Sequence, residues 1–144
     1  MQDDKISLEI HNPNNHNELT VEVWIDSNKL YDKNPEQGVN QIDCYIPEDE
    51  SEHVLKFVLK NKLPHHTTVN EQGDIIADSV ISFKNITFDE INVDSIVNTV
   101  AEYTHNFNGN GNTVTESFCQ TMGCNGNVQI SFSTPFYIWL LEHM

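Results

Sequence analysis

The sequence is short of basic residues, of proline and glycine, and of long hydrophobic runs, and each shortage excludes a class of protein. Seven Lys plus Arg stand against 22 Asp plus Glu, which gives a formal net charge of −15. This charge repels phosphate backbones and acidic lipid surfaces, so we expect no nucleic-acid partner and no membrane partner. No run of about eighteen apolar residues occurs, so no spanning helix is predicted. Five Pro and six Gly are too few for a disordered chain.

The sequence also lacks a secretory signal and a disulfide framework. It starts with Met-Gln-Asp-Asp-Lys, without a basic region followed by an apolar one, which predicts synthesis in a cytoplasm. Its three cysteines are Cys44, Cys119 and Cys124. An odd number in such a chain favours free thiols, with a Cys119 to Cys124 pair as the alternative.

The apolar residues that are present follow the period of β-strands. A chain of 144 residues fits a single domain, residues 1–144. Apolar side chains recur at every second position far more often than at every third or fourth. The clearest alternating segments are residues 19–25, 42–46, 53–60, 81–88, 91–95 and 128–132. Nine or ten short strands with regular turn signals predict an all-β protein, an antiparallel two-sheet jelly-roll β-sandwich.

The segment Gly73–Asp94 carries the most local detail. Its apolar residues change phase between Phe83 and Ile86, which predicts a β-bulge near Lys84 and Asn85. The pair Asp89-Glu90 predicts a two-residue turn. After it, residues 94–102 have rough helical spacing, but their β-branched content favours a non-helical structure. The Asn/Gly tract at 106–112 predicts a long hairpin tip.

The last apolar segment, Phe136-Tyr-Ile-Trp-Leu-Leu141, predicts a strand that is hydrophobic on both faces. Such a strand must be central in the sandwich or covered by another chain. We therefore expect a partner interface formed by Phe136, Tyr137, Trp139 and Leu141.

No catalytic motif supports an enzyme. The sequence lacks a Gly-x-Ser-x-Gly elbow, a phosphate-binding glycine loop and a His-Glu-x-x-His helix. The neighbours His65 and His66 point to opposite sides of an extended chain, which favours a solvated loop over a shared metal ion. A partial zinc set of His105, Cys119 and Cys124 lacks a fourth ligand.

Acidic loops and aromatic residues suggest two kinds of ligand. Calcium binds six to eight oxygen ligands from irregular loops, and Asn61, Asp74 and Asp78 are the candidate ligands. In an acidic protein most such loops bind nothing, which is the alternative. Trp24 and Tyr31 are candidate platforms for a sugar ring, although such residues more often lie in a core or an interface.

Four segments resemble the jelly-roll carbohydrate-binding modules of the calcium-dependent, xylan-binding type. They are LTVEVWIDSNKL from Leu19, HVLKFVLKN from His53, DSVISF from Asp78 and FDEINVD from Phe88. The resemblance covers residues 19–94 and implies calcium as a cofactor, held by Asn61, Asp74 and Asp78. The sequence departs from the family pattern at Lys62, where an acidic residue is expected.

The order of segments, with Gly-Asp-Ile-Ile-Ala-Asp-Ser at 73–79 and Pro-Phe-Tyr-Ile-Trp-Leu-Leu-Glu at 135–142, is also similar to small structural proteins of tailed phages of marine bacteria. This resemblance implies a non-enzymatic virion subunit of a capsid, tail or fibre. It would be oligomeric in the assembly and held by other virion proteins through residues 136–141. The alternative is a calcium-dependent module that binds a host glycan, a cell-surface or plant-type polysaccharide.

Overall fold

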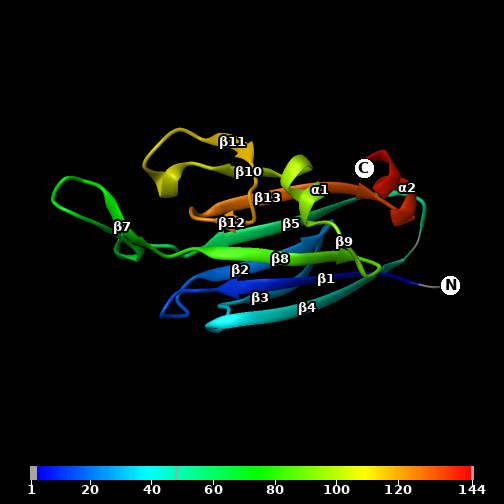
Figure 1. Ribbon diagram of the computed structural model, residues 1–144, viewed down its shortest axis with the longest axis horizontal. Coiled ribbons are helices and arrows are strands. Elements are labelled where there is room, and N and C mark those ends of the chain that lie inside the picture. Colours follow the sequence, from blue (N-terminus) through cyan, green and yellow to red (C-terminus); the bar gives the residue numbers. More distant parts are fainter. Residues whose placement is uncertain (1–2, 48, 144) are drawn as a thin grey trace.

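The computed structural model describes residues 3–47 and 49–143, and it is a sandwich of two antiparallel sheets (Figure 1). The first sheet contains β1 (Asp3–Asn12), β4 (Gly38–Pro47), β8 (Ile81–Phe88), β9 (Ile91–Asn92) and β12 (Thr121–Met122). Its strand order is β12-β8-β1-β4, and β9 pairs with β8.

The second sheet contains β2 (Thr20–Ile25), β3 (Asn28–Lys33), β5 (Glu52–Lys60), β10 (Glu102–His105), β11 (Val114–Ser117) and β13 (Gly126–Ser133). Its order is β11-β10-β13-β5-β2-β3. A separate two-stranded sheet joins β6 (Thr67–Val69) and β7 (Ile75–Asp78). The predicted class is therefore confirmed: two antiparallel sheets pack as a sandwich.

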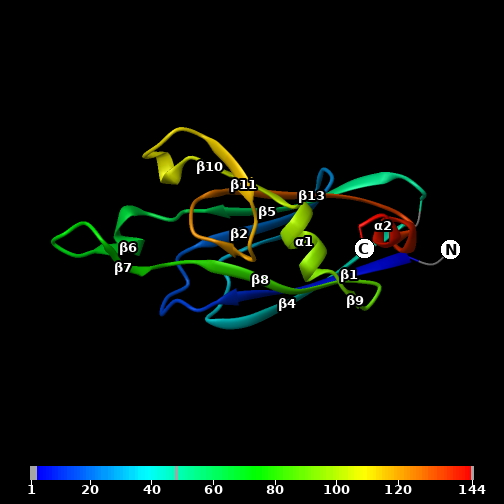
Figure 2. The ribbon, with the colours of Figure 1, turned by 45° about the horizontal axis from the view of Figure 1, so that its top comes forward.

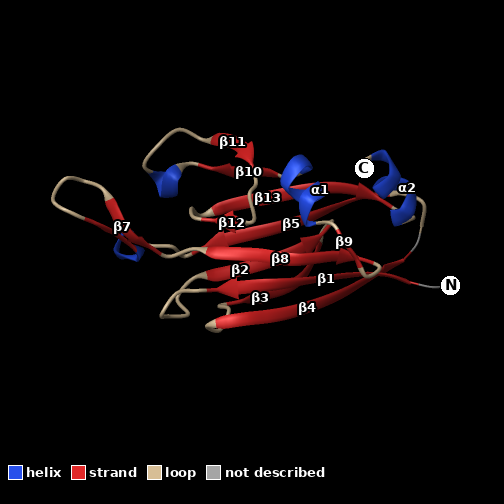
Figure 3. Ribbon diagram, viewed as in Figure 1, coloured by secondary structure: helices blue, strands red, loops and turns tan. Residues whose placement is uncertain are grey.

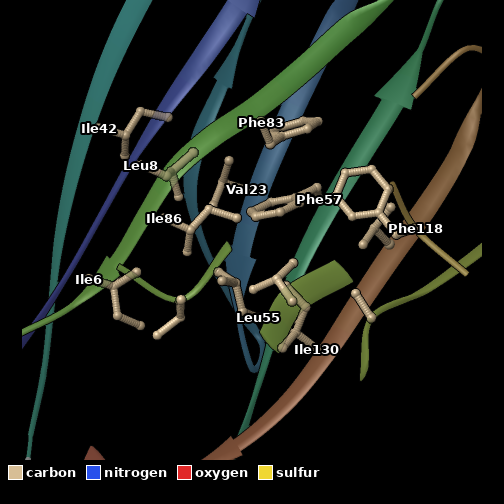
Figure 4. Packing of buried hydrophobic residues seen from close by; sticks show 14 of the residues in the cluster. Ile6, Leu8, Val23, Ile42, Leu55, Phe57, Phe83, Ile86, Phe118 and Ile130 are labelled. Atoms are coloured by element: carbon tan, nitrogen blue, oxygen red, sulfur yellow. The ribbon is translucent and has the colours of Figure 1, made fainter. Parts of the chain in front are cut away.

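The core lies between the two sheets and is formed by the alternating side chains of their strands. Phe57 of β5 and Phe83 of β8 are fully buried, and their rings stack with centroids 4.3 Å apart (Figure 4). Phe118 completes this aromatic cluster, with its ring centroid 6.2 Å from that of Phe83. The stacked pair links the two sheets, because each ring comes from a different one.

The predicted bulge and turn in the Gly73–Asp94 segment are confirmed. Between β1 and β8, Ser7 pairs with Thr87 but Glu9 pairs with Lys84, so β8 holds one extra residue there. Asn85 in the bulge has φ 51°. The turn residues Asp89 and Glu90 have φ 49° and 71°, which is the type I′ geometry that matches strand twist.

Strand β1 was not among the predicted elements, although it lies in the middle of the first sheet between β4 and β8. Its apolar residues Ile6, Leu8 and Ile10 alternate and are fully buried. The same period-2 pattern that predicted the other strands was present in this segment.

The prediction of a non-helical segment after Asp94 is wrong, because α1 (Asp94–Val100) is a helix. The Asp94 carboxylate accepts hydrogen bonds from the backbone amides of Asn85 and Ile86, at 3.1 and 2.8 Å. Val97 is buried in the core. Tertiary anchoring and burial of one face outweigh the weak helix propensity of the β-branched residues.

The prediction of a terminal strand is also wrong, because α2 (Phe136–Glu142) is a helix that closes one end of the sandwich (Figure 3). Phe136 and Trp139 pack on the ring of Phe88, with centroids 4.6 and 5.3 Å away. Their spacing, continued by Leu140, follows one helical face. A short segment that is apolar throughout fits either period, and burial against Phe88 selects the helix.

This helix divides the predicted interface residues into two groups. Phe136 and Trp139 are buried in the core of their own chain, so their side chains offer almost no surface to a partner. Tyr137 and Leu141 point outward, with 63% and 70% of their surface exposed.

His53 connects three loops at the end of the sandwich that carries α2. Its Nδ1 lies 2.7 Å from Asp26 Oδ2, and its Nε2 lies 2.9 Å from Asp49 Oδ1. Asp49 also accepts the hydroxyl hydrogen bond of Thr134, at 2.9 Å. Burial opposes a charged imidazole, but the hydrogen bonds to the two carboxylates raise the pKa of His53 above 6.5. Hydrogen bonds from Ser51 and His53 hold the pKa of Asp49 below its usual range.

Cys44, Cys119 and Cys124 are free thiols, as predicted. Burial raises the pKa of the Cys44 thiol to about 11, which suppresses its reactivity. Neither helix of the described residues has the length and apolar character needed to cross a membrane.

Candidate functional site at the base of the arm

The hairpin formed by β6 and β7, residues 67–78, projects beyond the ends of both large sheets (Figures 1 and 2). We call it the arm. It exposes Val69, Ile75 and Ile76, the two isoleucines with 64% of their surface accessible. It carries acidic residues but no Lys or Arg. The arm is therefore an apolar and acidic projection that packs little of its own surface.

A buried lysine fixes the arm to the sandwich. Only 1% of the Lys62 side chain is exposed, and its ammonium group donates to Asp78 Oδ1 at 2.6 Å and to the carbonyl oxygen of Gly123. The same Asp78 oxygen accepts a hydrogen bond from Thr67 Oγ1 at 2.7 Å. The first and last residues of the arm thus meet at one carboxylate that Lys62 neutralises.

Three histidines surround Glu18 beside this anchor. Nε2 of His65 and Nε2 of His66 each lie 3.3 Å from Glu18 Oε1. Nδ1 of His16 lies 3.9 Å from Glu18 Oε2, and the rings of His16 and His66 stack at 4.8 Å. Hydrogen bonds from His65 and His66 lower the pKa of Glu18. We call these four residues the histidine cluster.

The histidine cluster lies in a hollow of about 620 Å³ between the loop that precedes β2 and the base of the arm. The loop supplies His16 and Glu18, and the 3₁₀ helix η1 (Pro64–His66) supplies the other two members. Ser79, which follows the arm, closes the hollow through a 2.8 Å contact between its Oγ and His16 Nε2. Segments more than forty residues apart in sequence meet here.

The prediction that His65 and His66 point to opposite sides is wrong. It assumed an extended backbone, but these residues lie in η1, where both Nε2 atoms approach the same Glu18 oxygen. The Pro64 that starts η1 was a usable signal, since proline favours the first position of a helical turn.

Hydrogen bonds define the protons on two of the rings. The backbone amide of Glu18 donates to His16 Nδ1 at 3.2 Å, and that of Leu63 donates to His66 Nδ1 at 2.9 Å. A nitrogen that accepts a hydrogen bond carries no proton, so both rings hold a proton on Nε2. The Nε2–H group of His16 donates a hydrogen bond to Ser79 Oγ, and that of His66 donates one to Glu18 Oε1.

The three predicted calcium ligands lie in different hydrogen-bond environments. The side-chain amide of Asn61 donates to Thr20 Oγ1 at 2.7 Å, and the backbone N–H of Asp74 donates to Asn70 Oδ1 at 2.9 Å in the arm. Asp78 holds Lys62, as described above. The ammonium group supplies at Asp78 the positive charge that a calcium ion would bring. The calcium assignment stays a prediction.

The two predicted sugar platforms are half-buried and lie under lysines. The ammonium groups of Lys29 and Lys56 lie 5.6 and 5.0 Å from the ring centroid of Trp24, and that of Lys33 lies 5.8 Å from the Tyr31 ring. These cation–π contacts use ring surface on which a sugar would stack. Sugar binding at these residues stays a prediction.

The three residues of the partial zinc set line one hollow, but their ligand atoms do not form a close group. His105, Cys119 and Cys124 line a second hollow of about 500 Å³, where His105 Nε2 contacts Glu116 Oε1 at 2.9 Å. Among residues 3–47 and 49–143, the group of His, Cys, Asp or Glu side chains with ligand atoms near enough to share an ion is His16, Glu18 and His66. The histidine cluster is therefore the stronger candidate site.

Comparison with known proteins identifies no relative of this chain. No family model, no curated protein and no solved structure matches it.

Proposed function

We propose that this protein is a non-enzymatic structural subunit of a larger assembly, and that the assembly is the virion of a tailed bacteriophage. The observation that carries the proposal is the arm, which exposes Val69, Ile75 and Ile76 on a hairpin that projects from the sandwich. Exposed apolar surface of this kind is typical of protein contact sites. The phage assignment rests on the sequence resemblance.

The chemistry of the arm indicates how it would bind. Both strands of the two-stranded sheet have an outer edge, so an extended segment of a partner can add to either one. The ion pair of the buried Lys62 with Asp78 holds the base of the arm in place, so the arm loses less conformational entropy when it binds a partner. The outward residues Tyr137 and Leu141 of α2 offer a second contact surface at the other end of the sandwich.

A virion-incorporation experiment tests the proposal. The chain is quantified by mass spectrometry in purified particles, as wild type, as the double variant I75S/I76S and as the control V39S. Val39 is as exposed as the two isoleucines but lies on β4. We expect stoichiometric incorporation of the wild type and the control, and at least tenfold less of the double variant.

Two results would contradict the proposal separately. Particles free of the chain would refute the virion role. Equal incorporation of all three proteins would refute the role of the arm. The circular dichroism spectrum and Tm of the double variant should match those of the wild type, because the substituted side chains are exposed and make no core contact. The carbohydrate-binding alternative stays a prediction from resemblance.

A further inference from the structure

We propose that the histidine cluster binds one divalent transition-metal ion, with zinc as the best-fitting metal. The ion would be held by His16, Glu18 and His66, with His65 as the fourth donor. Imidazole nitrogens and a carboxylate form a ligand set that zinc prefers, whereas calcium and magnesium require oxygen donors. This site is independent of the proposed assembly function and of the calcium ligands predicted from the sequence.

Two of the donor distances in the cluster match those around a tetrahedral ion, and a third, between His16 Nδ1 and Glu18 Oε2, is longer at 3.9 Å. Two donors bonded to one tetrahedral zinc at about 2.0–2.1 Å lie about 3.3–3.4 Å apart. His65 Nε2 and His66 Nε2 each lie 3.3 Å from Glu18 Oε1. The donor atoms of His16, Glu18 and His66 all lie within 4.8 Å of one another, so small side-chain movements bring the three onto one ion.

The surroundings of His16 suit a metal ligand. Metal-bound histidines almost always donate their other ring N–H to a protein oxygen, which fixes the tautomer. His16 Nε2 donates to Ser79 Oγ at 2.8 Å, which leaves Nδ1 facing Glu18. Ser79 is therefore the positioning residue of the site, and it is itself buried. To bind the ion, His16 Nδ1 must give up the hydrogen bond that it accepts from the Glu18 backbone amide at 3.2 Å.

His66 must change its tautomer to bind the ion. Its Nε2 proton, now directed at Glu18, leaves to solvent, and a proton moves onto Nδ1, where the Leu63 amide now donates. The loss of that amide hydrogen bond weakens binding, and the exchange gives a specific spectroscopic signal. His65, whose Nε2 lies 3.3 Å from Glu18 Oε1, is the fourth donor beside His66.

The hollow gives the ion a route to its ligands. Glu18 and His65 are exposed, whereas the His66 side chain is only 1% exposed. An ion can therefore enter over Glu18 and reach the buried ring behind it. Because the cluster links the loop before β2 to η1, the ion would cross-link both segments to the base of the arm.

Zinc titration of the untagged protein tests the proposal. Isothermal titration calorimetry at pH 7.5 should show one equivalent of zinc bound with a micromolar or lower Kd. E18Q and H16Q should weaken binding at least tenfold, and S79A should weaken it by about tenfold through the orientation of His16. H143Q is the matched control, because His143 is an exposed histidine at the C-terminal end of α2, and it should leave the Kd unchanged.

Two further measurements separate a specific site from weak surface binding. At one zinc concentration, zinc should raise the Tm of the wild type and the control more than that of E18Q. Nitrogen-15 NMR of the histidine rings should show the proton of His66 move from Nε2 to Nδ1 on zinc addition. Absence of binding at 100 µM zinc, or equal affinity in wild type, E18Q and H16Q, would overturn the proposal. E18Q replaces an exposed side chain, so its metal-free Tm serves as the folding check.

Discussion

The ion pairs of His53 with Asp26 and Asp49 should make the free energy of unfolding depend on pH. The substitution His53→Gln should remove this dependence. Solvent screens both pairs, because the carboxylates of Asp26 and Asp49 are 43% and 40% exposed. An ion pair this exposed contributes at most about 1 kcal/mol. For loss of the Asp26 pair we therefore expect His53→Gln to lower the free energy of unfolding by about 1 kcal/mol near pH 6.

The direction of the pH effect follows from the pKa shifts. The pKa of His53 is raised, so its contribution is complete below pH 6.5 and is lost as the pH rises through the folded-state value. The pKa of Asp49 is lowered, so its contribution is present above pH 3.8 and is lost as the pH falls through the folded-state value. Stability from this contact is therefore greatest between about pH 4 and 6.5.

The assay is urea unfolding at low salt of wild type, H53Q and H143Q at half-unit steps from pH 5 to 9. The free energies of unfolding of wild type and H53Q should converge as the pH rises, because deprotonation removes from the wild type what the substitution has already removed. H143Q should follow the wild type. A difference between wild type and H53Q that stays constant over this range would refute the charged state of His53.

Three further predictions concern the core, the arm and the turn. In a double-mutant cycle with Phe57→Leu and Phe83→Leu, urea unfolding should give a coupling energy of about 0.5–1.5 kcal/mol, and zero coupling would mean that the stacked rings add only burial. Lys62→Met should destabilise the fold by about 1–3 kcal/mol, since Asp78 and the Gly123 carbonyl lose the ammonium group, and should speed proteolysis of the arm; an unchanged Tm would contradict this. Glu90→Gly should raise the free energy of unfolding by about 0.5–1 kcal/mol, because glycine accepts φ 71° without strain; a lower Tm would contradict it.

The fold could be predicted well wherever a strand has one buried face. The alternation of Leu55, Phe57 and Leu59 predicted β5, and a change of phase predicted the bulge at Asn85. Prediction failed at the two helices. Both are seven residues long. The β-branched residues of α1 outweighed its helical spacing in the prediction, whereas α2 is apolar almost throughout and fits either period. Contacts distant in the sequence decide the outcome in both. Helix α2 shows this clearly, because its packing partner Phe88 lies in another element.

The candidate site could be predicted much less well. His16 and Glu18 precede the second strand, whereas His65 and His66 follow the fifth, and no spacing rule joins them. They meet because β2 and β5 are antiparallel neighbours, so the start of one lies beside the end of the other, as in the pair of Thr20 and Lys60. A sequence search that paired the residues flanking neighbouring antiparallel strands would have brought the four together.

The central position of β1 determines when the protein can fold during synthesis. Ile6 pairs with Phe88, about eighty residues later, and in the other sheet Leu55 pairs with Ile130, about seventy-five residues later. Neither sheet can form completely until most of the chain has left the ribosome. Until then the early strands have edges whose backbone groups lack their partner strand. The net charge of −15 carried by the whole chain makes copies of it repel one another, which opposes pairing between the open strand edges of different chains.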